Sequence, residues 1–181
     1  MVADLIIRES TSSDLQAVME VEREAFGSEE NAILVRDLLS DPTAEPRLSL
    51  LAILGDQPVG HIIFTQAIFD PPISVKGAIL GPLAVIPAHQ KEGVGGRLIE
   101  TGLDILRSRG VDWVFALGHE SYYPKFGFTP AQKQGFEPPH PFPEKYTNAW
   151  MAMALTPTLI AAYQGLVIPA DTFDDPRYWG E

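Results

Sequence analysis

The chain has 181 residues, with 24 acidic and 13 basic side chains that give a formal net charge of −11. It has no cysteine, which excludes disulfides, thiolate metal sites and a cysteine acyl-enzyme. A histidine metal site is not expected, because the four histidines are scattered. Broad nucleic-acid binding is disfavoured, since phosphate neutralisation needs clustered Lys and Arg. The acidic charge favours solubility first, and attraction of a cationic substrate such as an amine second.

We expect no membrane association. The N-terminal residues 1–5 lack a basic region followed by a long apolar run, so no signal peptide is predicted. No uncharged apolar stretch is long enough to span a bilayer. The expectation is therefore a cytoplasmic protein, either monomeric or homodimeric.

The front half of the chain predicts a strand, two helices and a hairpin. Residues 5–8 read as the first strand, and the cluster Thr11-Ser12-Ser13-Asp14 begins a helix with apolar positions at helical spacing. A second helix is predicted over residues 29–39. Residues 48–54 and 59–64 are apolar runs around a Gly-Asp-Gln-Pro turn, which indicates a β-hairpin.

The back half predicts one strand–helix–strand crossover. Residues 78–85 form a continuous apolar run, which is typical of a strand buried on both faces. A long amphipathic helix follows and stops at Gly110, and residues 111–117 read as a further buried strand. A short helix is predicted at 122–126, and strands at 149–155 and 165–169. The order predicts an α/β fold whose front half is antiparallel.

A glycine-rich turn, Gln90-Lys91-Glu92-Gly93-Val94-Gly95-Gly96, joins the buried strand to the long helix. A helix start presents unpaired N–H groups and the positive end of the helix dipole, which favour an anion. The three glycines let the backbone approach that anion closely. The dinucleotide-binding pattern GxGxxG would require a glycine where Leu98 stands. The Walker pattern requires Gly-Lys-Ser/Thr, whereas Gly96 is followed by Arg97 and Leu98. We predict a pyrophosphate-binding turn; the alternative is a turn without a ligand.

The pair Gly81-Pro82 interrupts the strand before this turn. Proline cannot donate to the ladder and glycine weakens it, so a bulge or splay is predicted. A splay would leave backbone groups of Leu83, Ala84 and Val85 unpaired by the sheet. The amides of a pantetheine arm could pair with them as an added strand does. An ordinary edge-strand kink is the alternative.

These residues resemble a known family. Gln90-x-x-Gly93-x-Gly95 is similar to the Q/R-x-x-G-x-G/A signature of the GNAT N-acetyltransferases, and it follows Leu-Gly-Pro-Leu-Ala-Val-Ile-Pro at residues 80–87. Residues 117–128, Leu-Gly-His-Glu-Ser-Tyr-Tyr-Pro-Lys-Phe-Gly-Phe, resemble the family's second motif, a tyrosine shortly before Gly-Phe. The pattern is most similar to the YhbS-like branch of predicted acetyltransferases and covers roughly residues 5–155.

The resemblance implies a fold and a cofactor. The GNAT fold has a mixed, mostly antiparallel sheet of six or seven strands, a central parallel pair splayed at the cofactor site, and about four flanking helices. The implied cofactor is acetyl-CoA, with its pyrophosphate on the amides of Gln90 to Gly96, Arg97 near the CoA phosphates, and pantetheine along Leu83, Ala84 and Val85.

The resemblance also implies a reaction. An amine of a small molecule or a protein attacks the thioester directly in a ternary complex, and CoA leaves as product. Tyr123 matches the family's usual general-acid position. The alternative is that Tyr123 only packs its ring and leaves its hydroxyl at the surface.

One feature of the family is missing. Many relatives carry a glutamate base on the strand before the cofactor turn, whereas residues 78–85 contain no acid. His119 and Glu120 follow a strand at its carboxyl end, and Glu22 and Glu24 lie on the first helix, which often borders the acceptor site in this family. An ordinary solvated side chain is the alternative for each of them, and deprotonation of the amine in solvent is another.

Two other functions remain open, namely a non-catalytic acyl-CoA-binding or regulatory module on the same fold, and a nucleotide-binding module using the same turn. Walls of the acceptor pocket are expected from the loops 26–30, 69–75 and 135–146.

We expect residues 1–155 to form the acetyltransferase domain and residues 156–181 to be a strand and tail packed on it or reaching a partner. His61 is expected to be a packed or edge histidine.

Overall fold

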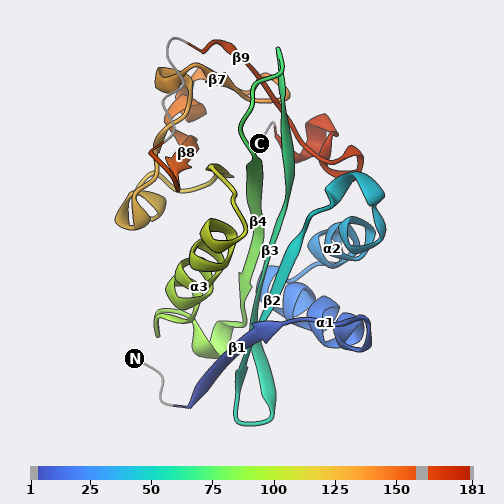
Figure 1. Ribbon diagram of the computed structural model, residues 1–181. Helices are drawn as coiled ribbons and strands as arrows, with labels where there is room; N and C mark the ends of the chain where they lie inside the picture. Colours follow the sequence, from blue (N-terminus) through green and yellow to red (C-terminus); the bar gives the residue numbers. More distant parts are fainter. Residues whose placement is uncertain (1–3, 158–162, 180–181) are drawn as a thin grey trace.

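The computed structural model describes residues 4–157 and 163–179. One mixed sheet runs through the molecule, with α1 and α2 on one face and α3 on the other (Figure 1). The strand order is β1-β2-β3-β4-β5-β8-β6, while the short strands β7 and β9 join through β3. All neighbours along this path are antiparallel except β4 and β5. The predicted mixed sheet with a central parallel pair is confirmed.

The helices are α1 (Leu15–Phe26), α2 (Glu30–Ser40) and α3 (Val94–Ser108), and several single 3-10 turns lie between elements. The strands are β1 (Leu5–Glu9), β2 (Leu48–Leu54), β3 (Gln57–Asp70), β4 (Gly77–Val85), β5 (Trp113–Leu117), β6 (Thr129–Pro130), β7 (Phe136–Glu137), β8 (Trp150–Ala154) and β9 (Gly165–Ile168).

Most predicted elements are confirmed to within a few residues, and β3 is the main difference. It was predicted over residues 59–64 but continues to Asp70. Beyond Thr65 its side chains alternate between buried and partly or fully exposed, so the continuous apolar signal stops there. The extension is stabilised by pairing with β9, which lies far away in the sequence. Local pattern therefore could not define this end of the strand.

The helix α3 packs very closely on the sheet at one point. A methyl group added at Gly102 would overlap the ring of Phe64, which is fully buried on β3. The glycine therefore sets the distance between helix and sheet, and with it the position of the helix start that carries the glycine-rich turn.

Replacing Gly102 with alanine is expected to destabilise the fold. Alanine favours a helix over glycine by about 1 kcal/mol, but overpacking a well-filled core typically costs about 1–3 kcal/mol. Urea unfolding should show a lower midpoint for Gly102→Ala and little change for Glu100→Ala, an exposed position on the same helix. A Gly102→Ala variant as stable as its parent would contradict this close packing.

The C-terminal segment lies on the core. β9 pairs with the end of β3 through Ile68↔Ile168 to Asp70↔Leu166. After it, Trp179 is only 2% exposed and packs edge-on against Trp150, with ring centroids 5.5 Å apart. Of the two alternatives for this tail, the described residues place it over the core.

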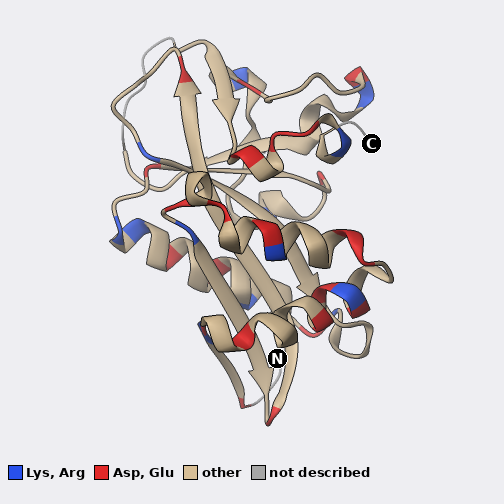
Figure 2. Cartoon of the chain, turned by 90° about the vertical axis from the view of Figure 1, so that its right-hand side faces the viewer, with Lys and Arg blue, Asp and Glu red and all other residues tan. Residues whose placement is uncertain are grey.

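The outer face of α1 and α2 is rich in acidic residues. These helices face the viewer in Figure 2, where red segments lie along them. Their acidic residues with at least partly exposed side chains include Glu20, Glu24, Glu30 and Asp37. In the part of the chain that the structure describes, no helix combines the length and the apolar character needed to cross a membrane.

Candidate active site

The sheet opens between its two parallel strands. β4 and β5 pair from Gly77↔Trp113 to Leu80↔Ala116, and the pairing stops there although β4 continues to Val85. At this point the register of β3 and β4 shifts, because one residue of β3 opposes both Gly81 and Pro82. The predicted bulge and splay are confirmed. Among the described strands, none pairs with Leu83 to Val85 on the side of β5.

The glycine-rich turn lies at the end of this open edge. Gly93 has a φ of 88° and precedes the first residue of α3. The first backbone hydrogen bond of the helix runs from the Arg97 N–H to the Gly93 carbonyl at 3.1 Å. The N–H groups of Val94, Gly95 and Gly96 precede it and have no partner within the helix, and no described side chain caps them. The turn thus presents donors to an anion.

Other residues of the turn have structural partners. The Gln90 side-chain amide donates to the Val85 carbonyl at 2.9 Å, so it ties the turn to the end of β4. Glu92 accepts a hydrogen bond within the turn from the His89 ring, 2.9 Å away. Lys91 is exposed, and Arg97 donates to the Leu5 carbonyl at 3.3 Å. Gln90, Lys91, Glu92 and Arg97 are predicted to bind the cofactor; in the structure Gln90 and Glu92 have partners within the chain beside the turn, and Arg97 is hydrogen-bonded to β1.

A cleft of about 410 Å³ runs along the opening between the strands. Leu80 to Leu83 of β4 form one wall, and Leu117, Gly118 and His119 at the end of β5 face them. Tyr122 and Tyr123 line the same cleft. The structure therefore brings His119 and Tyr123 together with the open edge of β4.

Tyr123 is held firmly in the cleft. Its side chain is 9% exposed, and its ring meets the rings of Tyr122 and Phe128 edge-on at centroid distances of 5.3 and 5.6 Å. Any side chain at Gly118 would overlap the Tyr123 ring. Burial, with a smaller contribution from Tyr122, raises the pKa of the Tyr123 hydroxyl to about 12, so this hydroxyl stays protonated at neutral pH.

Tyr122 is a site residue that the sequence motif did not single out. A methyl group added at Gly95 would lie 2.9 Å from the Tyr122 hydroxyl oxygen. Tyr122 therefore connects the glycine-rich turn to the cleft. Burial raises the pKa of its hydroxyl as well. In the sequence, only its position next to Tyr123 in the same motif indicated that Tyr122 could line the site.

The acidic candidates lie elsewhere. Glu24 is exposed and lines a separate hollow with Gln57 and Pro58. Glu120 is exposed and is not part of the cleft lining. Glu22 is completely buried under α1 and also lies outside the cleft lining. The structure does not bring any of these carboxylates to Tyr123.

Glu22 belongs instead to a buried polar chain. One Glu22 carboxylate oxygen lies 2.7 Å from Nδ1 of His61, and Nε2 of His61 lies 2.8 Å from the Ser49 hydroxyl, which accepts from Ser10 at 2.6 Å. Both Glu22 and His61 are fully buried. Burial raises the pKa of the Glu22 carboxyl, and the hydrogen bond from His61 opposes this only in part. His61 is confirmed as a packed histidine.

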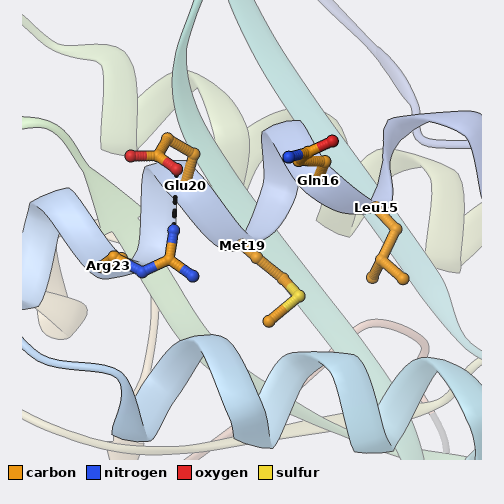
Figure 3. A pocket seen from close by; sticks show the side chains of 5 residues that line it. All are labelled: Leu15, Gln16, Met19, Glu20 and Arg23. Carbon is orange, nitrogen blue, oxygen red and sulfur yellow. Dashed lines mark hydrogen bonds and ion pairs between the residues drawn. The ribbon is translucent and has the colours of Figure 1, made fainter.

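Two further hollows are separate from the cleft. The larger, about 670 Å³, lies at the other end of α3 beside Leu106 and Arg109. Phe69, Ile73 and Val75 line this hollow and do not line the Tyr123 cleft. The prediction that the loop 69–75 forms a wall of the acceptor pocket is therefore wrong. The other hollow is on the outer surface of α1, around Leu15, Gln16, Met19, Glu20 and Arg23 (Figure 3).

Comparison with known proteins now identifies the family. A model of the acetyltransferase (GNAT) family matches residues 15–128, a range that includes the glycine-rich turn and Tyr123. The chain belongs to the GNAT family of acetyltransferases. An uncharacterised N-acetyltransferase of Escherichia coli, YjhQ, is 49% identical over 149 residues, which cover 80% of this chain and 81% of YjhQ.

Solved structures of GNAT proteins have the same fold. The YhbS acetyltransferase of Escherichia coli, in complex with CoA, matches with a TM-score of 0.85 and 25% identity over 95% of this chain and 93% of its own. A GNAT acetyltransferase of Brucella melitensis, in complex with acetyl-CoA, matches with a TM-score of 0.75 and 28% identity over 94% of this chain and 98% of its own. The likeness to the YhbS-like branch is confirmed.

Proposed function

We propose that this GNAT protein is an N-acetyltransferase that moves the acetyl group of acetyl-CoA directly to a primary amine. One observation carries the proposal: a single cleft joins the unpaired edge of β4 to Tyr123, and the free helix start lies beside it. The two GNAT relatives crystallised with CoA and acetyl-CoA support this choice of cofactor.

We also infer that the chain forms one domain, because β9 pairs with β3 and so joins the C-terminal segment to the main sheet.

The described residues fit a CoA ester. The free N–H groups of Val94, Gly95 and Gly96 would hold the pyrophosphate, since they combine with the positive end of the α3 dipole. A methyl group on Gly95 would lie within 4 Å of Leu83, Val85 and Tyr122, so the glycine keeps a space that a side chain would fill. The unpaired edge of Leu83 to Val85 would receive the pantetheine amides.

The transfer requires one proton to leave the amine and one to reach the sulfur. When bound, acetyl-CoA supplies a thioester with an electrophilic acyl carbon. The acceptor nitrogen forms a bond to this carbon while the carbon–sulfur bond breaks, so the amine loses a proton and the sulfur gains one. Tyr123 is suited to donate, because its hydroxyl stays protonated far above neutral pH.

We propose that His119 assists in removing the amine proton, because it is the described histidine that lines the cleft. Glu24 and Glu120 lie outside the cleft and take no part in the proposed mechanism. The strand before the turn still offers no acid.

The test combines turnover with binding. Thiol release from acetyl-CoA should appear with some member of a panel of primary amines, and calorimetry should show CoA binding. Binding without turnover for any amine would favour the non-catalytic module. Displacement of CoA by ATP or NAD would favour the nucleotide module. If no CoA species raises the melting temperature, both CoA-dependent functions fail.

Replacing Gly95 with valine is expected to weaken CoA binding by about tenfold or more, a loss of roughly 1.4 kcal/mol. The added side chain would fill the space between the turn, Val85 and Tyr122. Calorimetric titration with CoA measures this loss. Glu100→Val introduces the same residue on an exposed face of α3 and should bind CoA like the parent. Equal CoA affinity in both variants would remove the turn from the pyrophosphate site.

A further inference from the structure

The part of the cleft away from the turn is built by other elements. Phe26 comes from the end of α1, Asn31 and Leu34 come from α2, and Phe173 and Tyr178 come from the C-terminal tail. This acceptor wall, defined by these five residues, faces the strand opening where the thioester would lie. It joins segments from the two ends of the chain, so no single sequence window encodes it.

Hydrogen bonds hold the C-terminal segment against the end of α2 near the acceptor wall. Asp41, at the end of α2, accepts hydrogen bonds from the Thr172 N–H at 2.9 Å and from the Thr172 hydroxyl at 2.7 Å. Burial alone would raise the pKa of Asp41, but hydrogen bonds from Thr43 and Thr172 outweigh it and lower the pKa to about 2. The carboxylate is therefore charged at neutral pH. The Trp179 indole donates to the Phe173 carbonyl at 2.8 Å and closes the tail on itself.

The α1–α2 side of the acceptor wall is also held. Arg23 forms ion pairs with Glu20 at 2.7 Å and with Glu29, and so links α1 to the residue before α2 (Figure 3 shows the Glu20 contact). The Arg23–Glu29 pair spans the turn between Phe26 and Asn31. Contacts within the chain thus support both sides of the acceptor wall.

The five side chains of the acceptor wall carry no charge themselves, and the charged group stacked on one of them is a cation: the Arg177 guanidinium lies over the Tyr178 ring, 4.8 Å from its centroid. Along the whole cleft, the described lining residues include no Asp, Glu, Lys or Arg, and His119 is the one imidazole. The outside of α1 and α2 is acidic by contrast, as Figure 2 shows. An ammonium group that is buried without a carboxylate partner is costly, so each additional positive charge on a substrate would oppose binding.

We propose, on the basis of the acetyltransferase function above, that the acceptor is a primary amine on an uncharged aromatic or aliphatic body, and that Phe173 and Tyr178 determine this specificity. The acidic exterior attracts the protonated amine by its charge. Desolvation in the uncharged cleft then favours the neutral, nucleophilic form of the amine. This environment reduces the need for the missing strand glutamate.

The test compares two amines of different charge. For phenethylamine, kcat/KM should exceed that for putrescine by about tenfold or more, since putrescine brings a second ammonium that would need a partner. Tyr178→Ala should raise the KM for phenethylamine and leave the affinity for CoA unchanged. Tyr178 is partly exposed and the protein should remain folded, which the melting temperature verifies.

A charge added to the wall should change the preference. Asn31→Asp places a carboxylate in the acceptor half and should shift the ratio of kcat/KM values toward putrescine. Asn148→Asp adds the same charge at an exposed position outside the cleft lining and should leave the ratio as in the parent. An unchanged ratio in Asn31→Asp would overturn the assignment of this wall.

The outcomes separate the inference from the proposed function. Turnover with a preference for putrescine would overturn the inference and leave the acetyltransferase function standing. If no amine is turned over, the proposed function fails, and calorimetric titration with phenethylamine in the presence of CoA decides whether the acceptor wall binds an apolar amine. The parent should bind phenethylamine more tightly than putrescine, and Tyr178→Ala should weaken the binding of phenethylamine. No detectable binding of phenethylamine to the parent would refute the apolar acceptor site.

Discussion

Replacing Tyr123 with phenylalanine is expected to lower kcat by about a hundredfold or more, which is the lower range for losing a general acid or base. The change removes only the hydroxyl that would protonate the departing sulfur. The ring contacts with Tyr122 and Phe128 remain, so the variant should fold normally and bind CoA with nearly unchanged affinity. Single-turnover rates with acetyl-CoA and an accepted amine give the measurement.

Two neighbouring variants show whether the effect belongs to the Tyr123 hydroxyl. Gly118→Ala keeps the hydroxyl but forces the Tyr123 ring aside, so it should also lower kcat. Tyr122→Phe removes the hydroxyl beside Gly95 and should affect CoA affinity more than kcat. Normal turnover in Tyr123→Phe would remove Tyr123 from the mechanism and leave it a packing role.

The pH dependence of kcat gives an independent check. Because the pKa of Tyr123 is raised to about 12, its hydroxyl remains a proton donor throughout the neutral and mildly alkaline range. Activity should therefore not fall in that range through ionisation of Tyr123. A decline there that Tyr123→Phe abolishes would contradict the raised pKa.

The second large effect is on stability, at the buried pair of Glu22 and His61. Glu22→Ala is expected to lower the free energy of unfolding by about 2–5 kcal/mol, because it leaves a buried polar group unpaired and creates a cavity. The change leaves Nδ1 of His61 without its partner at 2.7 Å and opens a cavity under α1. Urea unfolding measures the loss. Glu22→Gln keeps an oxygen at this place and should cost much less.

The same pair should contribute to the pH dependence of stability. The folded state raises the pKa of Glu22, so it keeps this proton to a higher pH than the unfolded chain does. Its contribution to stability is complete below the pKa of the unfolded chain and is lost as pH rises through the folded-state pKa. From acidic to neutral pH, the melting temperature of the parent should therefore fall relative to that of Glu22→Gln. Parallel curves would refute a raised pKa.

The motifs were predictable because they depend on neighbours in the sequence. A turn that begins a helix needs glycine where φ is positive, as at Gly93, and a strand that splays needs residues such as Gly81 and Pro82 that weaken the ladder. Helical spacing and continuous apolar runs defined most of the elements. The strand pattern also placed His119 just after β5, and the resemblance to the family singled out Tyr123; both line the cleft.

The acceptor side was not predictable in the same way. Glu24 seemed a reasonable candidate from its place on the first helix, but the rotation of α1 directs it to a hollow beside Pro58. That rotation depends on how α1 packs on β3, which buries Glu22 against His61 instead. A shift of one or two residues along a helix changes the face by 100° or more, so residue type and approximate position could not decide between the two glutamates.

The sequence by itself determined the α/β class, the glycine-rich turn and the interruption of β4, because each depends on backbone preferences within a few residues. The tyrosine motif was found by its resemblance to the GNAT family. Only the tertiary structure decided what lies opposite them. The tail, the elbow between α1 and α2, and the end of β5 meet in one uncharged cleft. They are held by contacts between distant segments, such as that of Asp41 with Thr172, 131 residues further along the chain. Such contacts follow from the packing of all elements together, and no local pattern in the sequence carries them.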